Sequence, residues 1–396
     1  MSVARMPVPA EDAQAISQDL CAALRKEIRA VGDLSFARYM ELVLYEPGLG
    51  YYSAGSRKFG EGGDFVTAPE ISPLFSRCLA RQCAQVLAAI DRDKKRTVLE
   101  LGAGSGRMAA DILAELSALD CLPDRYLILE VSADLRDRQQ ARLAADMPGY
   151  FPSIEWLVDF PASPVHGCIV ANEVLDALPI ERFIISDGEL LQVMVGLEDD
   201  HFCLRSREMP ANLASRVSDR LSLPVAKYSP GYTSEFCPAL GPWVASVASC
   251  LEEGMLLFTD YGLVRADYYH PDRADGTLMC HYRHRAHDEV FFWPGLQDIT
   301  AWVEFSALAE AAGDCGLELA GFTTQAHWLL SLGLDQLVAQ SVAGDRKDQV
   351  ELAQQVKTLT LPGEMGERFK AIAFTREMDI ALHGFAMRDF SDRLPQ

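Results

Sequence analysis

The feature that most constrains the fold is a glycine-rich turn that follows an apolar run. Residues 98–107 read VLELGAGSGR, with Gly102, Gly104 and Gly106 between a strand-like segment and the start of a helical pattern. Glycine lets the backbone turn sharply and lets a ligand approach the chain closely. A strand, a glycine turn and a helix start, in that order, predict a ligand-binding loop at the carboxyl end of a strand.

Apolar strands and helices alternate from residue 97 onward. The strands that we expect are TVLELGAG, RYLILEVS, IEWLV, CIVANEV, GMLLFTDYG, LELAGFTTQ and RFKAIAFTR, and the first two are followed by the helices RMAADILAELSAL and ADLRDRQQARLAAD. Strands rich in Val, Ile and Leu that are separated by helices indicate a parallel sheet covered on both faces. We therefore expect an α/β fold with a doubly wound sheet.

The sequence suggests a division into three parts. Residues 1–95 form an N-terminal segment that packs on the core, with helices at 11–30, 36–44 and 72–90 and a glycine-rich stretch at 45–70. Residues 96–376 form the core, and residues 377–396 form a tail. We expect two insertions in the core: a β-hairpin at about 181–209, because Asp187-Gly188 is a typical turn pair, and a helical insertion at about 326–366.

The composition limits the classes of binding partner and the cellular location that we expect. The chain has 36 Lys and Arg against 57 Asp and Glu, a formal net charge of −21, which disfavours nucleic acid and suits a basic protein segment. No apolar run approaches the ~18–20 residues of a membrane helix. The N-terminus resembles neither a secretory signal nor a transit peptide. The ten cysteines form no CxxC pair. We therefore expect a cytoplasmic protein with reduced thiols and no membrane insertion.

Three carboxylates accompany the strand ends near the glycine turn. Glu100 lies within the first strand, Glu130 ends the second, and Asp159 follows the third. Glu100 would repel a pyrophosphate but could pair with an amino-bearing or positively charged ligand. An acid in the position of Glu130 typically accepts hydrogen bonds from ribose hydroxyls, and Asp159 could accept from an adenine amino group. Together they favour a nucleoside without a phosphate, as in the S-adenosylmethionine (SAM) site of a class I methyltransferase.

A fourth group of polar residues follows the fourth strand. In the motif NEVLDALP, Asn172, Glu173 and Asp176 stand among apolar residues. Such carboxylates could hold a guanidinium by bidentate hydrogen bonds and aim its lone pair at a methyl group. The alternative is that Asn172 caps a helix while Asp176 lies on the surface.

The sequence resembles the MidA-like SAM-dependent methyltransferases from about residue 34 to about residue 376. The resemblance rests on SFARYMELVLYEPGLGYY, GDFVTAPEIS, LELGAGSGR, NEVLDALP, DYG at 260–262, GTL at 276–278 and PGLQDITAWVEF at 294–305. It implies a Rossmann-like core that uses SAM to methylate an arginine of a protein substrate, as in respiratory complex I assembly. It also implies that a segment before the core closes the cofactor pocket, with the residues Gly63, Asp64, Thr67, Pro69 and Glu70.

Other interpretations remain open from the sequence. The chain could be an assembly factor that uses SAM structurally, or a methyltransferase of small molecules. A nicotinamide oxidoreductase is disfavoured because the spacing is GxGxG and not GxGxxG. His281, His284 and His287 could share a helix face in a metal site, but interleaved arginines favour a loop without metal. The oligomeric state, including a homodimer, is left open.

Overall fold

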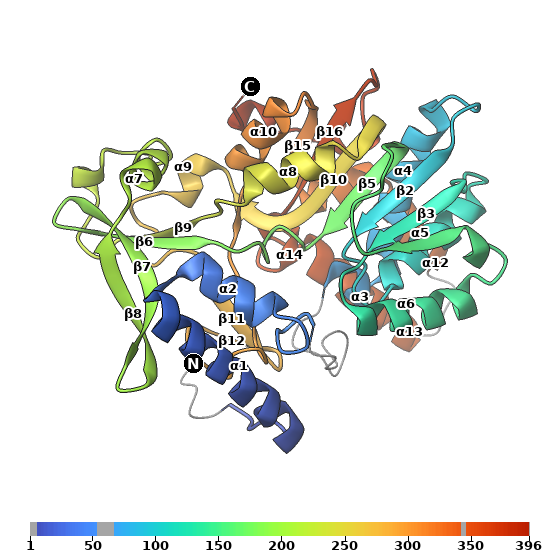
Figure 1. The fold of residues 1–396 in the computed structure, drawn as a ribbon. Coiled ribbons are helices and arrows are strands. Elements are labelled where there is room, and N and C mark those ends of the chain that lie inside the picture. The colour runs from blue at the N-terminus through green and yellow to red at the C-terminus, as the bar shows by residue number, and fades with distance from the viewer. Residues whose placement is uncertain (1–5, 54–66, 342–345, 396) are drawn as a thin grey trace. The chain divides into compact units, whose positions relative to one another are not determined.

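The computed structural model describes residues 6–53, 67–341 and 346–395, which form two compact units (Figure 1). Unit 1 comprises residues 6–53, 175–240 and 263–307. Unit 2 comprises residues 67–174, 241–262 and 308–395, apart from 342–345. Within the described ranges, no helix combines the length and apolarity that a membrane crossing requires.

Unit 2 is built on a sheet with the strand order β15-β16-β10-β5-β2-β3-β4. Figure 1 shows these strands side by side. Their bounds are β2 Arg96–Leu101, β3 Arg125–Leu129, β4 Ile154–Leu157, β5 Val165–Asn172, β10 Leu251–Leu263, β15 Glu318–Thr324 and β16 Phe369–Arg376. The pairs from β10 through β4 are parallel, whereas β16 runs antiparallel to both of its neighbours. The predicted central sheet of an α/β fold is confirmed.

Burial explains why these segments form the inner strands. Five of the six residues of β2 are buried, and seven of the eight residues of β5. Side chains on a strand point alternately to its two faces, so burial of consecutive residues means that both faces are covered. The near-continuous Val, Ile and Leu runs of the sequence are therefore explained by their place inside the sheet.

Helices precede and follow the strands of unit 2. Their bounds are α3 Ala68–Ile71, α4 Pro73–Ala89, α5 Arg107–Ala118, α6 Ala133–Asp146, α8 Leu240–Ala248, α10 Phe305–Asp314, α11 Gln325–Ser331, α12 Leu334–Ser341, α13 Arg346–Thr360 and α14 Met365–Arg368. Helix α4 begins as predicted, with Pro73 in its first turn and the Ser72 hydroxyl accepting from the Leu74 amide at 3.3 Å. Helix α8 packs on β10 through Trp243 and Phe258, whose ring centroids lie 5.9 Å apart.

Unit 1 holds two smaller antiparallel sheets and several helices. One sheet has the order β1-β7-β6-β9, with β8 also paired to β7, and the other has the order β12-β11-β13. The strands of these sheets are β1 Leu34–Ser35, β6 Glu181–Ser186, β7 Glu189–Glu198, β8 His201–Glu208, β9 Thr233–Phe236, β11 Met279–Tyr282, β12 Arg285–His287 and β13 Asp298–Thr300. The short strand β14, Val303–Glu304, belongs to neither sheet. The helices are α1 Glu11–Val31, α2 Phe36–Tyr45, α7 Ala211–Ser218 and α9 Arg265–Tyr268.

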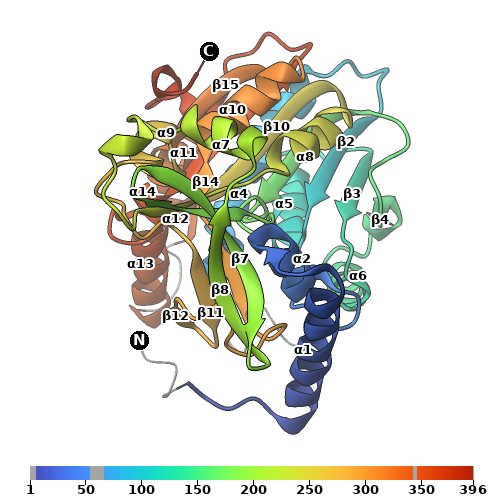
Figure 2. The same ribbon diagram turned by 60° about the vertical axis from the view of Figure 1, so that its left-hand side comes forward.

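Residues 181–209, where the sequence predicts a hairpin, hold the strands β6, β7 and β8. The turn between β6 and β7 has positive φ at both Asp187 (52°) and Gly188 (80°), which is why this residue pair suits a two-residue hairpin loop. A second turn joins β7 to β8, and the β7–β8 ribbon comes toward the viewer in Figure 2. Domain boundaries at residues 95 and 376 stay predictions.

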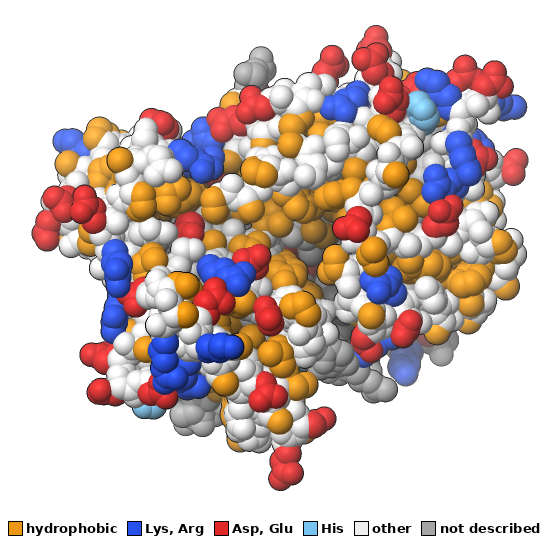
Figure 3. Space-filling view, in the orientation of Figure 1, with side chains coloured by type: hydrophobic (Ala, Val, Ile, Leu, Met, Phe, Trp, Pro, Cys, Tyr) orange, Lys and Arg blue, Asp and Glu red, His pale blue; other side chains and the backbone are white. Residues whose placement is uncertain are grey.

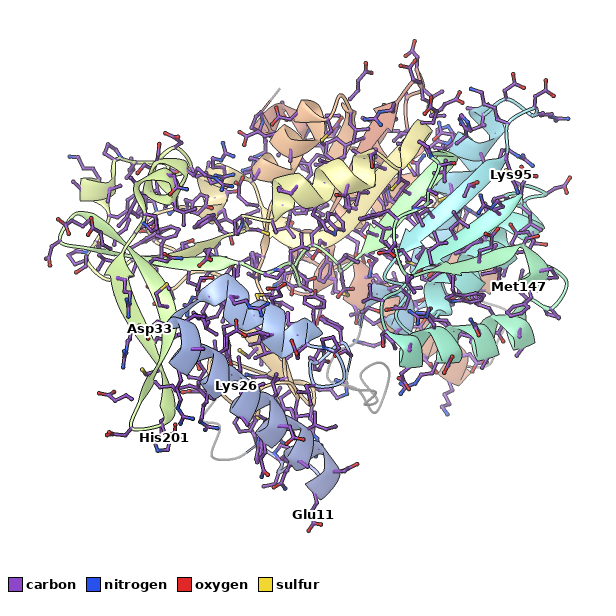
Figure 4. All side chains as sticks on the ribbon, viewed as in Figure 1. Glu11, Lys26, Asp33, Lys95, Met147 and His201 are labelled. Atoms are coloured by element: carbon purple, nitrogen blue, oxygen red, sulfur yellow. The ribbon has the colours of Figure 1, made fainter. Side chains whose placement is uncertain are left out.

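Helix α1 shows how unit 1 forms its core. Leu20, Leu24 and Ile28 recur every four residues and are buried in a cluster that also contains residues of α2, such as Tyr39. The Tyr39 hydroxyl donates to the Val290 carbonyl at 2.8 Å, so this buried phenol is satisfied. Figure 4 labels Glu11 at the start of the same helix and Lys26 farther along it.

The histidine-rich segment of unit 1 differs from the sequence expectation of a helix face or loop. His281 lies on β11 and His287 on β12, and the two strands pair antiparallel around a turn at Arg283 and His284, both with positive φ. Burial, with a further contribution from His287, lowers the pKa of His281 to about 4, so this imidazole is neutral at physiological pH. In the described residues, no group of three or more His, Cys, Asp and Glu side chains is arranged to hold a metal ion.

Candidate cofactor and acceptor site

The glycine turn lies at the carboxyl end of β2, where the sequence places it. Gly102, Gly104 and Gly106 all have positive φ, at 68°, 53° and 77°. A Cβ on Gly102 would lie 3.2 Å from a methyl group of Val174, and one on Gly106 would lie 3.3 Å from Gln139. Glycine is therefore required both for the backbone conformation and for the room around the loop. Gly102 is exposed, so its backbone is open to a ligand.

Glu100 is fully buried inside β2. Its Oε2 accepts a hydrogen bond of 2.5 Å from the Tyr126 hydroxyl on β3, and its Oε1 has no partner among the described residues. Burial raises the pKa of Glu100 to about 7, against a smaller lowering by the Tyr126 hydroxyl. A buried acceptor atom without a partner is costly. An ammonium or other cationic ligand group would relieve that cost.

Glu130 follows β3 and is held by its own chain and by α6. Its Oε1 accepts from the Ser132 amide and its Oε2 accepts from the Gln139 side chain, each at 3.0 Å. The side chain is 6% exposed, and this burial raises its pKa. Both contacts fix the orientation of the carboxylate, and each oxygen keeps a second acceptor site for a ligand hydroxyl.

The carboxyl end of β4 carries Trp156 and, two residues after the strand, Asp159. The Trp156 indole N–H donates to the Gln139 Oε1 at 3.0 Å. Asp159 is exposed, so its carboxylate is available to a ligand and to solvent. Because β2, β3 and β4 are parallel neighbours, Glu100, Glu130 and Asp159 belong to one edge of the sheet. In Figure 4, Lys95 marks the opposite, amino end of β2.

Helix α3 contributes the residues that the family resemblance links to the cofactor pocket. Thr67 precedes the helix, Pro69 lies in its first turn, and Glu70 accepts a hydrogen bond from the Ser105 hydroxyl of the glycine turn. Glu70 is thus joined to the loop between β2 and α5. Gly63 and Asp64 lie outside the described residues.

Asn172 is the last residue of β5 and Glu173 follows it, and hydrogen bonds hold both side chains in place. Glu173 has a positive φ of 53°, which is rare for a residue with a side chain and is typical of functional sites. Its amide donates to the Thr259 carbonyl on β10 at 2.9 Å, while its Oε1 accepts from the Asn172 amide group at 3.0 Å and from the Ala68 backbone at 3.3 Å. The Asn172 Oδ1 in turn accepts from the Thr259 hydroxyl at 2.8 Å. Asn172 therefore orients the Glu173 carboxylate and does not cap a helix.

Asp176, the third polar residue of the motif, belongs to unit 1. It is 4% exposed, and its backbone carbonyl accepts from the Ala301 amide at 3.0 Å. The neighbouring Ala177 carbonyl accepts from the Tyr45 hydroxyl at 2.9 Å. The surface position considered from the sequence is therefore wrong for Asp176, which is buried.

Three residues that join the site were not identified from the sequence: Tyr126, Gln139 and Thr259. Tyr126 could have been found from strand pairing, because Val98 pairs with Tyr126 in the parallel register and Glu100 lies two residues farther on the same face. The sequence does not distinguish Gln139 from its neighbours, because it lies in the highly polar segment ADLRDRQQARLAAD.

The residues present fit a nucleoside ligand with a cationic tail. The buried Oε1 of Glu100, which has no partner in the part of the chain that the structure describes, suits a positive group. The oriented carboxylate of Glu130 suits hydroxyls, and the open backbone at Gly102 permits close approach. The buried carboxylate of Glu100, inside the strand that leads to the glycine turn, would oppose a pyrophosphate.

Comparison with known proteins agrees with this chemistry. Residues 78–323 match Methyltransf_28, a family of S-adenosyl-L-methionine-dependent methyltransferases. The chain belongs to this family. It is thus a SAM-dependent methyltransferase, as the resemblance in the sequence predicts. The chain is also 43% identical to a COG1565 superfamily member from Burkholderia thailandensis whose crystal structure holds S-adenosyl-homocysteine. That likeness has a TM-score of 0.92 and covers 98% of this chain and 100% of the other.

Curated relatives of this methyltransferase include the zebrafish (Danio rerio) and human (Homo sapiens) proteins named "Protein arginine methyltransferase NDUFAF7, mitochondrial". The zebrafish protein is 30% identical over 90% of this chain and 86% of its own length. The human protein is 28% identical over 88% of this chain and 82% of its own length. The expectation of a cytoplasmic protein is contradicted by these relatives, which are named as mitochondrial.

Proposed function

We propose that this methyltransferase modifies the guanidinium of an arginine in a protein substrate, and that unit 2 is a Rossmann-like class I core. The open sheet with acidic residues at its carboxyl edge supports the fold assignment. The names of the curated relatives support arginine as the acceptor. The net charge of −21 favours a basic substrate segment.

The proposed cofactor site lies at the carboxyl ends of the parallel strands of unit 2. Glu100 would face the amino or sulfonium charge, Glu130 the ribose hydroxyls and Asp159 the adenine amino group. The glycine turn would supply close backbone contact, and Glu70, with Thr67 and Pro69, would border the site from α3. The remaining proposed contributors are Gly63, Gly102, Gly104 and Gly106. Bound SAM supplies a methyl group that its sulfonium makes reactive.

Glu173 is the residue that we propose acts on the acceptor. The observation that carries this role is its positive φ together with a carboxylate whose Oε1 is held by Asn172 and Ala68. An oriented carboxylate can bind a guanidinium and direct one nitrogen toward the methyl group. Since a guanidinium stays protonated at physiological pH, its proton leaves during or after transfer.

The test uses purified protein, isotope-labelled SAM and protein extract from cells that lack this gene, in which acceptor sites are unmodified. We expect label in methylarginine within one or a few peptides, identified by mass spectrometry. Glu173→Gln should bind S-adenosylhomocysteine as wild type does and transfer at least about a hundredfold less label. Label confined to small molecules, or to residues other than arginine, would refute the acceptor assignment.

A further inference from the structure

Gln139 on α6 stands between three segments of the proposed cofactor site. Its amide nitrogen donates to the Gly104 carbonyl at 2.9 Å and to the Glu130 Oε2 at 3.0 Å. Its amide oxygen accepts from the Trp156 indole at 3.0 Å. The side chain is fully buried. One residue thus connects the glycine turn, the end of β3 and the end of β4.

The orientation of this amide is determined by its partners. An indole N–H can only donate, whereas a carbonyl and a carboxylate can only accept. The oxygen of Gln139 must therefore face Trp156, and its NH₂ group must face Gly104 and Glu130. A reversed amide would lose all three hydrogen bonds.

The contact with Glu130 has a chemical consequence for the ligand. A carboxylate held at Oε1 by the Ser132 amide and at Oε2 by Gln139 cannot rotate to other partners. The lone pairs that remain free on the carboxylate therefore point in a fixed direction. Selective binding of paired hydroxyls requires such a fixed direction. The same Gln139 side chain lies 3.3 Å from where a Cβ of Gly106 would be, so its position also limits the shape of the turn.

We infer that Gln139 is the positioning residue that makes this site selective for the ribose hydroxyls of its nucleoside ligand. It does so without touching the ligand, by holding the Glu130 carboxylate and the Gly104 carbonyl in a fixed relation. This inference rests on the proposed cofactor site at the edge of unit 2. It does not depend on what the methyl acceptor is.

The experiment measures binding by calorimetry with two probes, S-adenosylhomocysteine and its 2′-deoxyadenosyl analogue. The wild-type protein should prefer the first by roughly tenfold or more, because one hydrogen bond to a charged group is lost with the second. In Gln139→Met, a variant of similar shape without the amide, the preference should fall below about threefold. Binding of S-adenosylhomocysteine itself should weaken by roughly tenfold.

A matched control separates positioning from general stability. Gln82 on α4 is also fully buried in unit 2 and hydrogen-bonded, accepting from the Gly384 amide at 2.9 Å. Gln82→Met should lower the melting temperature much as Gln139→Met does, and it should keep the wild-type preference between the two probes. Trp156→Phe, which removes the indole donor and retains a ring, should reduce the preference in the direction of Gln139→Met.

The outcomes decide the inference without a methylation assay. A Gln139→Met protein that keeps the wild-type preference would overturn it, and so would a wild-type protein that does not distinguish the probes. Should Gln139→Met fail to fold, Trp156→Phe provides the same comparison, and an unchanged preference there would overturn the inference. A protein that shows the expected preferences but labels no arginine would refute only the proposed acceptor.

Discussion

Ionisation of Glu100 should make the unfolding free energy of this methyltransferase depend on pH. Burial raises the pKa of Glu100 from 4.5 to about 7 in the folded chain. Between these values the folded protein holds the Glu100 proton more tightly than the unfolded protein, so the unfolding free energy falls as pH rises. The stabilisation is complete below about pH 4.5 and is lost as pH rises through about 7.

The change that tests this is Glu100→Gln, which retains an acceptor for the Tyr126 hydroxyl and cannot ionise. Each tenfold change in proton affinity is worth about 1.4 kcal/mol, and so the pKa difference predicts an effect of about 2–3 kcal/mol between pH 5 and pH 8. Relative to wild type, the variant should be more favoured at pH 8 than at pH 5 by that amount. Other titrating groups cancel in the difference.

The assay is urea unfolding of both proteins, without ligand, at pH 5, 6, 7 and 8. Tyr126→Phe serves as the control, because the Tyr126 hydroxyl lowers the pKa of Glu100 and its removal should move the pH dependence to higher pH. A difference between Glu100→Gln and wild type that stays constant from pH 5 to pH 8 would show that Glu100 does not titrate in this range. The reasoning from burial would then fail.

Further predictions concern binding and transfer. Glu173→Gln should lower methyl transfer by about 10²–10⁴-fold while S-adenosylhomocysteine affinity, measured by calorimetry, stays within about threefold of wild type; equal loss of both would make Glu173 a cofactor residue. Gly104→Val forces a branched side chain onto a φ of 53° and should abolish cofactor binding, whereas Gly149→Val, at a position with open space, should bind normally in the same titration. Asp159→Ala, which removes the acceptor, should weaken S-adenosylhomocysteine binding by a few-fold, roughly the value of one exposed hydrogen bond; unchanged affinity would remove Asp159 from the site.

Hydrophobic pattern predicts the sheet of unit 2 well, because burial on both faces leaves a direct trace in the sequence. The strand at residues 98–101 is apolar apart from Glu100, and that exception is a buried carboxylate of the candidate site. The glycine spacing likewise predicts the turn, since positive φ at Gly102, Gly104 and Gly106 excludes most other residues. Both features depend on residues that are close together in the chain, so they can be recognised from a single sequence.

What the sequence does not predict depends on contacts between distant segments. The positive φ of Glu173 is stabilised by Thr259 on β10, and the role that we infer for Gln139 depends on partners in three other segments. Asp176 stands three residues after Glu173, yet it belongs to unit 1. The histidine segment forms a hairpin because Arg283 and His284 adopt turn conformations, which their residue types do not signal.

The surface carries charges of both signs (Figure 3), although the net charge of the chain is strongly negative. In the face that Figure 3 shows, basic side chains are interspersed with acidic ones, and apolar side chains lie between them. Some of the basic side chains are paired; Arg38, for example, bonds to both Glu27 and Glu41, at 2.8 Å each. Such exposed pairs contribute little to stability. They reduce the number of free positive charges that would repel a basic substrate.

The most direct test of the central claim is a calorimetric titration of the purified protein with S-adenosylhomocysteine and, separately, with NAD. The edge of unit 2, with its glycine turn and buried carboxylates, should bind the first with one site per chain and give no binding heat with the second. Gly104→Val should abolish the first signal. Binding heat with NAD and none with S-adenosylhomocysteine would contradict the account.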